Sequence, residues 1–198
     1  MQLKAPAIVL AARPHGENAV ILRALTSEEG MIAAYVAGGQ GRRLRPVVIP
    51  GNTVEADIRA RSASQLPFGK VELVTSRAPW LNEPLPAAAI LWVTALTASA
   101  LPERNPYPRL YEALDGLLDA ICHAPSARGW APALLSYEAL LLRDLGYGGM
   151  KPEAGDLPQT LAALGAIGSA LERYLLADRH GDAMAARGRL LERLARIA

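Results

Sequence analysis

Short apolar runs separated by turn-forming residues make up the first 78 positions of the chain. The later runs alternate apolar and polar side chains with a period of two, which is typical of half-buried β-strands. Five β-strands are therefore predicted, at residues 6–13, 18–25, 31–38, 52–61 and 70–77. Five strands in so short a segment favour a small closed barrel, because closure removes the exposed edges that an open sheet would leave.

Beyond residue 85 the apolar positions recur about every three and a half residues, which indicates α-helices. Five helices are predicted: residues 86–101, a second from about 108, a third from Pro132 to Gly146, a fourth after Asp156, and a last from Asp182. The third is apolar on almost every face, so we expect it at the centre of a bundle. Asp156 and Gln159 have the spacing of a capping box, which marks a helix start.

These two patterns predict an α+β protein with two domains. A β-barrel is expected over residues 1–79 and an all-α helical bundle over residues 80–198. A chain of 198 residues, 51% of them apolar, is long enough to bury two small cores.

Charge is divided unevenly between these two predicted domains. Residues 1–79 carry ten Lys and Arg against six Asp and Glu, whereas residues 80–198 carry eleven against thirteen, which gives +4 and −2. The excess of positive charge suggests that the N-terminal part faces a polyanion. An ordinary solvated surface is the alternative interpretation.

Candidate groups for catalysis or metal binding are few. Cys122 is the only cysteine, so neither a disulfide framework nor a zinc site of paired cysteines is expected. His15, His123 and His180 have no metal-ligand or catalytic-triad spacing, and we expect neither an enzyme nor a cofactor. The apolar run 85–101 is interrupted by polar residues, so no membrane span is expected. The sequence therefore predicts a cytoplasmic protein.

The segment "GGQGRRLRP" at residues 38–46 combines glycines with three arginines, Arg42, Arg43 and Arg45. Its spacing fits neither the dinucleotide fingerprint nor the phosphate-binding loop, so nucleotide binding is not expected. We predict a mobile loop that needs no core contact and presents the arginines to the phosphates of DNA. A solvated hairpin tip is the alternative.

Further basic residues lie near the ends of the fourth and fifth predicted strands: Arg59, Arg61, Lys70 and Arg77. With the loop they are predicted to form a groove that follows one DNA backbone. Alternation places Glu55 and Asp57 on the same face as Arg59 and Arg61, so cross-strand ion pairs are an equally good interpretation.

Aromatic residues are scarce in the predicted barrel, which contains only Tyr35 and Phe68. Tight single-strand binders stack bases on exposed rings, so we expect this chain to bind DNA mostly through electrostatics. A strand held by its phosphates leaves its base edges free to pair, which suits strand annealing.

Two segments resemble one known family. "ARPHGENAVILRALTSEEGMIAAYVAGG" resembles the opening of the bacterial RecO family of DNA repair proteins, and "LLSYEALLLRDLGYG" resembles the central helix of that family. With the order of elements between them, the resemblance covers about residues 5–149.

The resemblance implies a recombination mediator with an N-terminal oligonucleotide-binding (OB-fold) barrel and a C-terminal helical domain. Members bind single- and double-stranded DNA, anneal complementary strands, contact RecR and the single-strand-binding protein, and help RecA load; none is known as an enzyme. A barrel-plus-bundle adaptor for RNA or protein is the alternative function. The family's cysteine cluster after Leu-Gly-Tyr-Gly is absent here, so no zinc module is expected.

The resemblance also implies a site for the acidic, Phe-terminated tail of the single-strand-binding protein. Such a tail needs an apolar pocket and a nearby cation. The residues predicted for this role are Leu134, Tyr137 and Leu141 as the pocket, with Arg143 or Arg128 as the cation. Some relatives have basic residues where this chain has Leu135 and Ser136, and core filling is the alternative role of the leucines.

The arginine stripe Arg189, Arg193 and Arg196 is a second candidate DNA contact or a solvated outer face.

Overall fold

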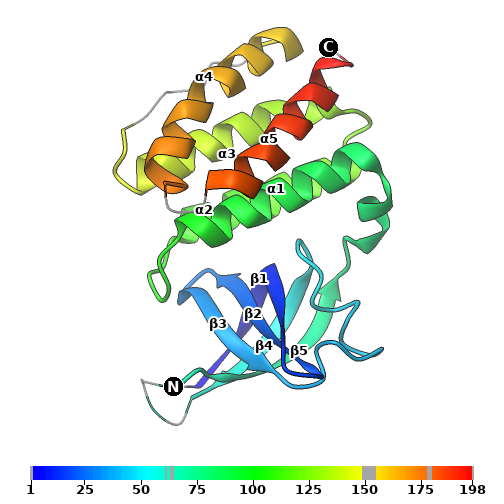
Figure 1. The fold of residues 1–198 in the computed structure, drawn as a ribbon, viewed down its shortest axis with the longest axis vertical. Helices are drawn as coiled ribbons and strands as arrows, with labels where there is room; N and C mark the ends of the chain where they lie inside the picture. The colour runs from blue at the N-terminus through cyan, green and yellow to red at the C-terminus, as the bar shows by residue number, and fades with distance from the viewer. Residues whose placement is uncertain (1, 61, 63–64, 149–154, 178–179, 198) are drawn as a thin grey trace. The chain divides into compact units, whose positions relative to one another are not determined.

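The computed structural model describes residues 2–60, 62, 65–148, 155–177 and 180–197. Five strands come first along the described part of the chain (Figure 1). They are β1 (Gln2–His15), β2 (Ala19–Thr26), β3 (Gly30–Val36), β4 (Thr53–Arg59) and β5 (Phe68–Thr75). All five predicted strands are confirmed, and only their ends differ.

The strands close into a barrel in the order β1-β2-β3-β5-β4. The long strand β1 pairs with β4 through its first half and with β2 through its second half, and its register shifts between Val9 and Ala11. The β3–β5 contact is parallel, with Tyr35 opposite Phe68, and there the Tyr35 N–H donates to the Pro67 carbonyl at 2.8 Å. A five-stranded barrel with these pairings is an OB-fold, which confirms the predicted fold class.

Strand alternation decides which side chains fill the barrel. Val54, Ala56 and Ile58 of β4 are almost completely buried, whereas Thr53, Glu55, Asp57 and Arg59 face outward. The same alternation in the other strands completes the barrel core, whose buried members are Ala7, Val9, Val20, Leu22, Ala24, Ile32, Ala34, Val36, Val48, Val54, Ala56, Ile58 and Val71.

A segment from the helical half of the sequence also belongs to the barrel. The Arg104 N–H donates to the Met31 carbonyl at 2.9 Å, and Met31 and Glu103 form an isolated β-bridge. Gly30, which has a φ of +70°, has no room for a Cβ because the backbone of Asn105 lies against it. The two compact units therefore differ from the predicted domains: residues 1–79 with 101–111 form the barrel unit, and residues 80–100 with 112–198 form the helical unit.

Five α-helices and two short 3₁₀ segments occupy the rest of the described chain. The helices are α1 (Pro84–Ala100), α2 (Pro108–His123), α3 (Ala131–Asp144), α4 (Leu157–Leu175) and α5 (His180–Ala195), and the 3₁₀ segments are Ala78–Asn82 and Ala127–Gly129. In the helical unit α1 packs against α5, and α3 packs against α4. No helix in the described ranges is long and apolar enough to cross a membrane.

Two helix predictions are confirmed by specific contacts. The Asp156 side chain accepts a hydrogen bond from the Gln159 N–H at 2.9 Å, and the Gln159 side chain accepts one from the Asp156 N–H, so the capping box is formed. Eight of the 14 residues of α3 are buried, as expected for the central helix of the bundle.

A buried ion pair joins four helices of the helical unit. Glu138 of α3 is 0% exposed and Arg187 of α5 is 3% exposed, and their side chains meet at 2.6 Å. The Trp92 indole of α1 donates to the same carboxylate at 2.8 Å, and Arg187 also donates to the Leu164 carbonyl of α4 at 2.7 Å. The two charges are thus matched by hydrogen bonds, which burial requires.

Candidate nucleic-acid interface

The basic glycine-rich segment forms an ordered series of turns between β3 and β4. The N–H groups of Arg45 and Val48 donate to the carbonyls of Gly41 and Leu44 at 2.9 and 3.0 Å, as in helical turns. Leu44, Val47 and Val48 pack against the barrel core. The prediction that this loop makes no core contact is therefore wrong, because the apolar residues between and beyond its arginines pack onto the barrel.

Side-chain amides anchor both ends of this loop. Gln40 donates to the carbonyls of Gly16 and Ala19 at 3.1 and 2.9 Å. Asn52, which is 0% exposed, donates to the carbonyls of Pro46 and Val47 at 2.9 and 3.1 Å. Asn and Gln amides satisfy turn carbonyls well because each carries two donors. Sequence reasoning missed both anchors, because a periodic pattern does not show which distant carbonyls an amide side chain reaches.

Arg77 is not part of a DNA-binding surface. It is only 2% exposed, and its guanidinium donates to the Gly51 carbonyl at 2.7 Å and to the Thr53 hydroxyl at 2.9 Å. Its N–H donates to Asn52 Oδ1 at 2.8 Å. The predicted role of Arg77 as a phosphate ligand is wrong, because its donors are used inside the protein to hold the junction of the loop and β4.

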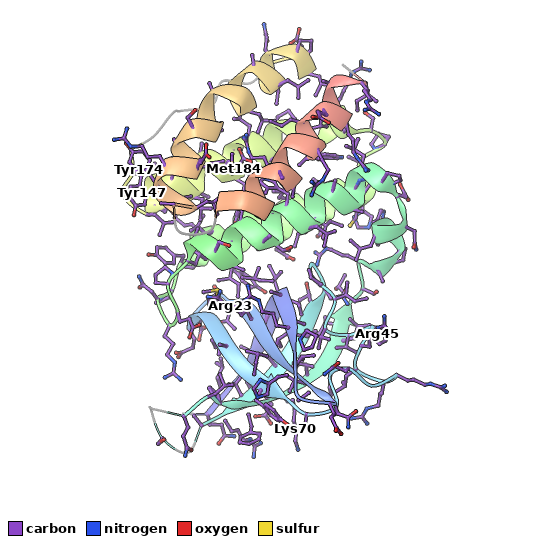
Figure 2. All side chains as sticks on the ribbon, viewed as in Figure 1. Arg23, Arg45, Lys70, Tyr147, Tyr174 and Met184 are labelled. Carbon is purple, nitrogen blue, oxygen red and sulfur yellow. The ribbon has the colours of Figure 1, made fainter. Side chains whose placement is uncertain are left out.

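The three loop arginines lie at the surface, and two of them border different hollows of the barrel unit. Arg43 and Lys70 line a hollow of about 540 Å³ with apolar walls that include Val36, Leu44 and Val71. Arg45 lines another hollow of about 360 Å³, together with Gln40, Pro14 and Val20. Arg45 and Lys70 lie at separate places on the barrel in Figure 2. The structure therefore brings Arg43 and Lys70 together and sets Arg45 apart from them.

Arg59 is exposed but already has an acidic partner. Its guanidinium donates to both carboxylate oxygens of Asp57, at 2.9 and 2.8 Å. This hydrogen bond holds the pKa of Asp57 below its usual value, and the charges of Arg59, Lys70 and Lys4 act in the same direction. The ion-pair interpretation is thus correct for Arg59. Lys4, Arg59 and Lys70 thus surround this carboxylate, and Glu55 and Glu72 form the next pair of positions on β4 and β5.

Strand register explains why these charges meet. Asp57 of β4 lies opposite Lys4 of β1 and opposite Lys70 of β5. Arg61, which was predicted to share this face, lies outside the described residues.

The predicted apolar pocket on α3 does not exist as a surface. Leu134 and Leu141 are 0% exposed and Tyr137 is 1% exposed, so all three fill the core of the helical unit. The Tyr137 hydroxyl lies 2.6 Å from the Thr97 hydroxyl, and burial raises the pKa of Tyr137 above its usual range. Arg143 is exposed and pairs with Asp144 at 3.4 Å. The assignment of the three apolar residues to a partner site is therefore wrong, and the core-filling alternative is correct.

An apolar hollow bordered by arginines is found between α1 and α5 instead. It has a volume of about 430 Å³, and its lining includes Leu81, Leu91, Arg189 and Arg193. Leu91 is 49% exposed, although α1 is otherwise rich in buried residues. Arg193 is oriented by its hydrogen bond to the Pro84 carbonyl at 2.6 Å. The signal for this site in the sequence was the spacing of the arginines on the last helix.

Metal-binding geometry is missing from the described residues. They contain no group of three or more His, Cys, Asp or Glu side chains that could hold a metal ion. Cys122 is buried, and the His123 ring packs edge-on against Trp80 with centroids 5.3 Å apart.

Similarity to a known family extends over most of the chain. Residues 1–77 match the family model for the N-terminal part of recombination protein O, and residues 82–148 match the model for its C-terminal part. The chain belongs to the RecO family. The resemblance noted in the sequence is therefore confirmed. Helices α4 and α5 follow residues 82–148, the segment that matches the C-terminal RecO model.

Curated relatives that carry the name DNA repair protein RecO agree with this assignment. The chain is 41% identical over 149 residues to the protein of Phenylobacterium zucineum, which covers 75% of this chain and 60% of that relative. It is 35% identical over 202 residues to the protein of Gluconacetobacter diazotrophicus, covering 100% and 76%. For Rhodospirillum centenum the identity is 43% over 143 residues, covering 72% and 56%. The chain thus spans about 60% of the length of several RecO relatives.

The RecO-like Leu-Gly-Tyr-Gly segment ends α3. Gly146 adopts a φ of +86°, a left-handed conformation that stops the helix, and the Tyr147 N–H donates to the Leu142 carbonyl at 2.9 Å. The Tyr147 ring then stacks on Tyr174 of α4 with centroids 5.0 Å apart, and the two rings lie together in Figure 2.

Proposed function

We propose that this chain acts in DNA repair as a recombination mediator whose barrel unit binds single- and double-stranded DNA without sequence preference and anneals complementary strands. The observation that supports this function is the placement of Arg43 and Lys70 together at the hollow of about 540 Å³. Lys4 and Arg59 add two further cations on β1 and β4, where they lie beside Asp57.

Phosphate contacts suit this role for a physical reason. Guanidinium and ammonium groups bind phosphate oxygens on any sequence, and each contact releases counterions from the DNA. Because the loop that carries Arg43 is packed onto the core, its cation needs little further ordering when DNA binds. Contacts limited to phosphates leave the base edges free, so two bound strands are able to pair.

Partners are part of the same proposal. We propose that the chain works with RecR and helps RecA load on strands coated with single-strand-binding protein, which rests on family membership. The hollow between α1 and α5 is a better candidate for the acidic tail of that protein than α3. Leu81 and Leu91 offer apolar contacts for a terminal ring, and Arg189 and Arg193 offer charges for its carboxylates. A cytoplasmic location remains a prediction.

A strand-annealing assay tests the function directly. Complementary labelled oligonucleotides, either naked or coated with single-strand-binding protein, should pair faster when the chain is added. A variant with Arg43→Ala and Lys70→Ala should lose much of the acceleration, whereas Glu172→Ala, an exposed change on α4, should keep it. No acceleration with either kind of DNA, together with binding to RNA or a protein, would support the adaptor alternative instead.

A further inference from the structure

The barrel carries an exposed aromatic cluster that the strand order creates. Tyr35 and Phe68 meet at the parallel contact of β3 with β5, and their ring centroids are 5.4 Å apart at an interplanar angle of 71°. The His15 ring from the end of β1 packs edge-on against Tyr35 at 5.9 Å. We call His15, Tyr35 and Phe68 the aromatic platform.

Phe68 is the most exposed large apolar residue in the described part of the chain, at 64%. It is also the only phenylalanine in the sequence. Burial of such a ring is ordinarily favourable, and the barrel core does not use it. An exposed ring that touches a second aromatic ring is therefore a candidate contact for a ligand.

Strand register places arginines on both sides of the aromatic platform. Across the barrel, Arg13 lies opposite Ile21, Ile21 opposite Tyr35, Tyr35 opposite Phe68, and Phe68 opposite Arg59. Neighbouring strands are about 4.8 Å apart, so Arg59 is one strand from Phe68 and Arg13 is two strands from Tyr35. All five side chains lie on the outer face, because the core residues alternate with them.

Two rings between two arginines match the chemistry of a single DNA strand. Bases stack on aromatic faces whatever their sequence, and arginines bind the phosphates that link them. In a duplex the bases are already stacked on one another, so the rings gain nothing from it. The cations and the rings together therefore point to a single strand rather than to a duplex.

We propose that the aromatic platform is a base-stacking site for single-stranded DNA, with Arg13 contacting an adjacent phosphate and Arg59 doing so in addition to its hydrogen bonds to Asp57. This inference rests on the proposed function. It adds base stacking to the phosphate contacts, although the scarcity of aromatic residues in the sequence favoured binding mostly through electrostatics. Phosphate contacts hold both the substrate strand and the annealed product, whereas the aromatic platform holds only the unpaired strand. Pairing of the bases removes the stacking contact, which favours release of the duplex.

The test compares three DNA ligands on the full chain by fluorescence anisotropy. They are oligothymidine, an abasic strand of the same length that retains its phosphates, and a duplex. Wild type should bind oligothymidine more tightly than the abasic strand. Phe68→Ala should weaken oligothymidine binding by about 5- to 150-fold for one stacked base and leave the other two ligands within about twofold.

Matched variants separate the ring from its bulk and position. Val74→Ala is the control, because Val74 is 60% exposed on the same strand and is not aromatic. It should leave all three affinities unchanged. Phe68→Tyr keeps a ring and should retain oligothymidine affinity, whereas Phe68→Leu keeps apolar bulk and should lose it. Phe68→Leu also preserves a usable comparison should the alanine variant fold poorly.

Each contrary result has a distinct meaning. Equal binding of oligothymidine and the abasic strand by wild type overturns the platform and leaves the proposed DNA binding intact. The platform is likewise overturned, and the proposed DNA binding is left intact, if Phe68→Ala weakens the binding of all three ligands equally. A change only in association with a protein has the same meaning. Wild type that binds none of the three ligands overturns the proposed function and the platform together.

Discussion

The barrel unit and the helical unit use the same residue types in opposite ways. In the barrel unit the Phe68 ring is 64% exposed and Arg43 borders an open hollow. In the helical unit Trp92 is 0% exposed, Trp130 is 2% exposed, and Arg187 is paired with a buried carboxylate. These rings and guanidinium groups thus lie at the surface in the barrel unit and hold helices together in the helical unit. Residue type alone does not show where a binding site lies.

Each unit also contains a buried arginine, and the two arginines have different kinds of hydrogen-bond partner. Arg187 donates to the side chain of Glu138, whereas the Arg77 guanidinium donates to a carbonyl and a hydroxyl. Burial of a cation requires hydrogen bonds in place of its contacts with water, and both arginines donate such bonds inside the protein. Substitutions at these sites should therefore change stability, and substitutions at exposed arginines should change binding.

The largest expected effect is loss of the buried ion pair. Glu138→Ala should lower the free energy of unfolding by about 3–5 kcal/mol, because it leaves the Arg187 charge buried without its carboxylate. Denaturant unfolding measures the change. Glu172→Ala, an exposed change on α4, is the control and should stay within about 0.5 kcal/mol of wild type. Equal stability of the two variants would mean that the buried pair does not hold the helical unit together.

Arg77→Ala should have the next largest effect, again on stability. One nitrogen, Nη1, donates to both the Gly51 carbonyl and the Thr53 hydroxyl, so we expect a loss of about 1.5–3 kcal/mol, the contribution of a hydrogen bond that involves a charged group. The folded fraction of this variant should retain the wild-type salt dependence of DNA binding. A flatter salt dependence at equal folding would show that Arg77 contacts phosphate after all, as its place in the sequence first suggested.

Replacement of Arg42, Arg43 and Arg45 by alanine should leave stability nearly unchanged and weaken DNA binding. Stability should change by less than about 0.5 kcal/mol, since all three side chains lie at the surface. The log–log slope of DNA affinity against salt should fall by about 0.7–0.9 for each phosphate that the loop no longer neutralises. Separate tests of Arg43→Ala and Arg45→Ala show which hollow the DNA follows, and an unchanged slope in the triple variant would exclude the loop.

A smaller effect is expected where the helical unit meets the acidic tail peptide. Arg189→Glu should weaken peptide binding by about 2- to 30-fold, because exposed ion pairs contribute about 0.2–1 kcal/mol and reversal turns attraction into repulsion. DNA binding should be unchanged. Arg143→Glu is the competing variant in a peptide titration, and a larger loss there would place the tail on α3 as first predicted.

The smallest expected effect is the loss, at acid pH, of the contribution that Asp57 makes to stability. The pKa of this carboxyl is lowered from 3.8 in the folded state, and the hydrogen bond from Arg59 is the largest cause. The contribution of Asp57 to stability is therefore present above pH 3.8 and is lost as the pH falls through the folded-state pKa. The difference in unfolding free energy between wild type and Asp57→Asn should shrink over that range. It should be small because the pair is exposed. A difference that is constant with pH would show that the pairing does not affect stability.

Much of the fold follows from local pattern. Alternation predicts the five strands and their inner faces, as at Val54, Ala56 and Ile58. The spacing of Asp156 and Gln159 predicts the start of α4, because a capping box involves only neighbouring residues. Two short segments were enough to recognise the RecO family.

The sequence alone therefore determined the elements, their faces, the family and the positive charge of the loop. Only the tertiary structure decided that Arg77 is buried, that Tyr137 fills a core, and that Tyr35 meets Phe68. The reason is that periodicity shows which face of an element is apolar, but not which distant element covers that face. The β3–β5 contact joins residues far apart in the chain, and no local pattern encodes such a pairing.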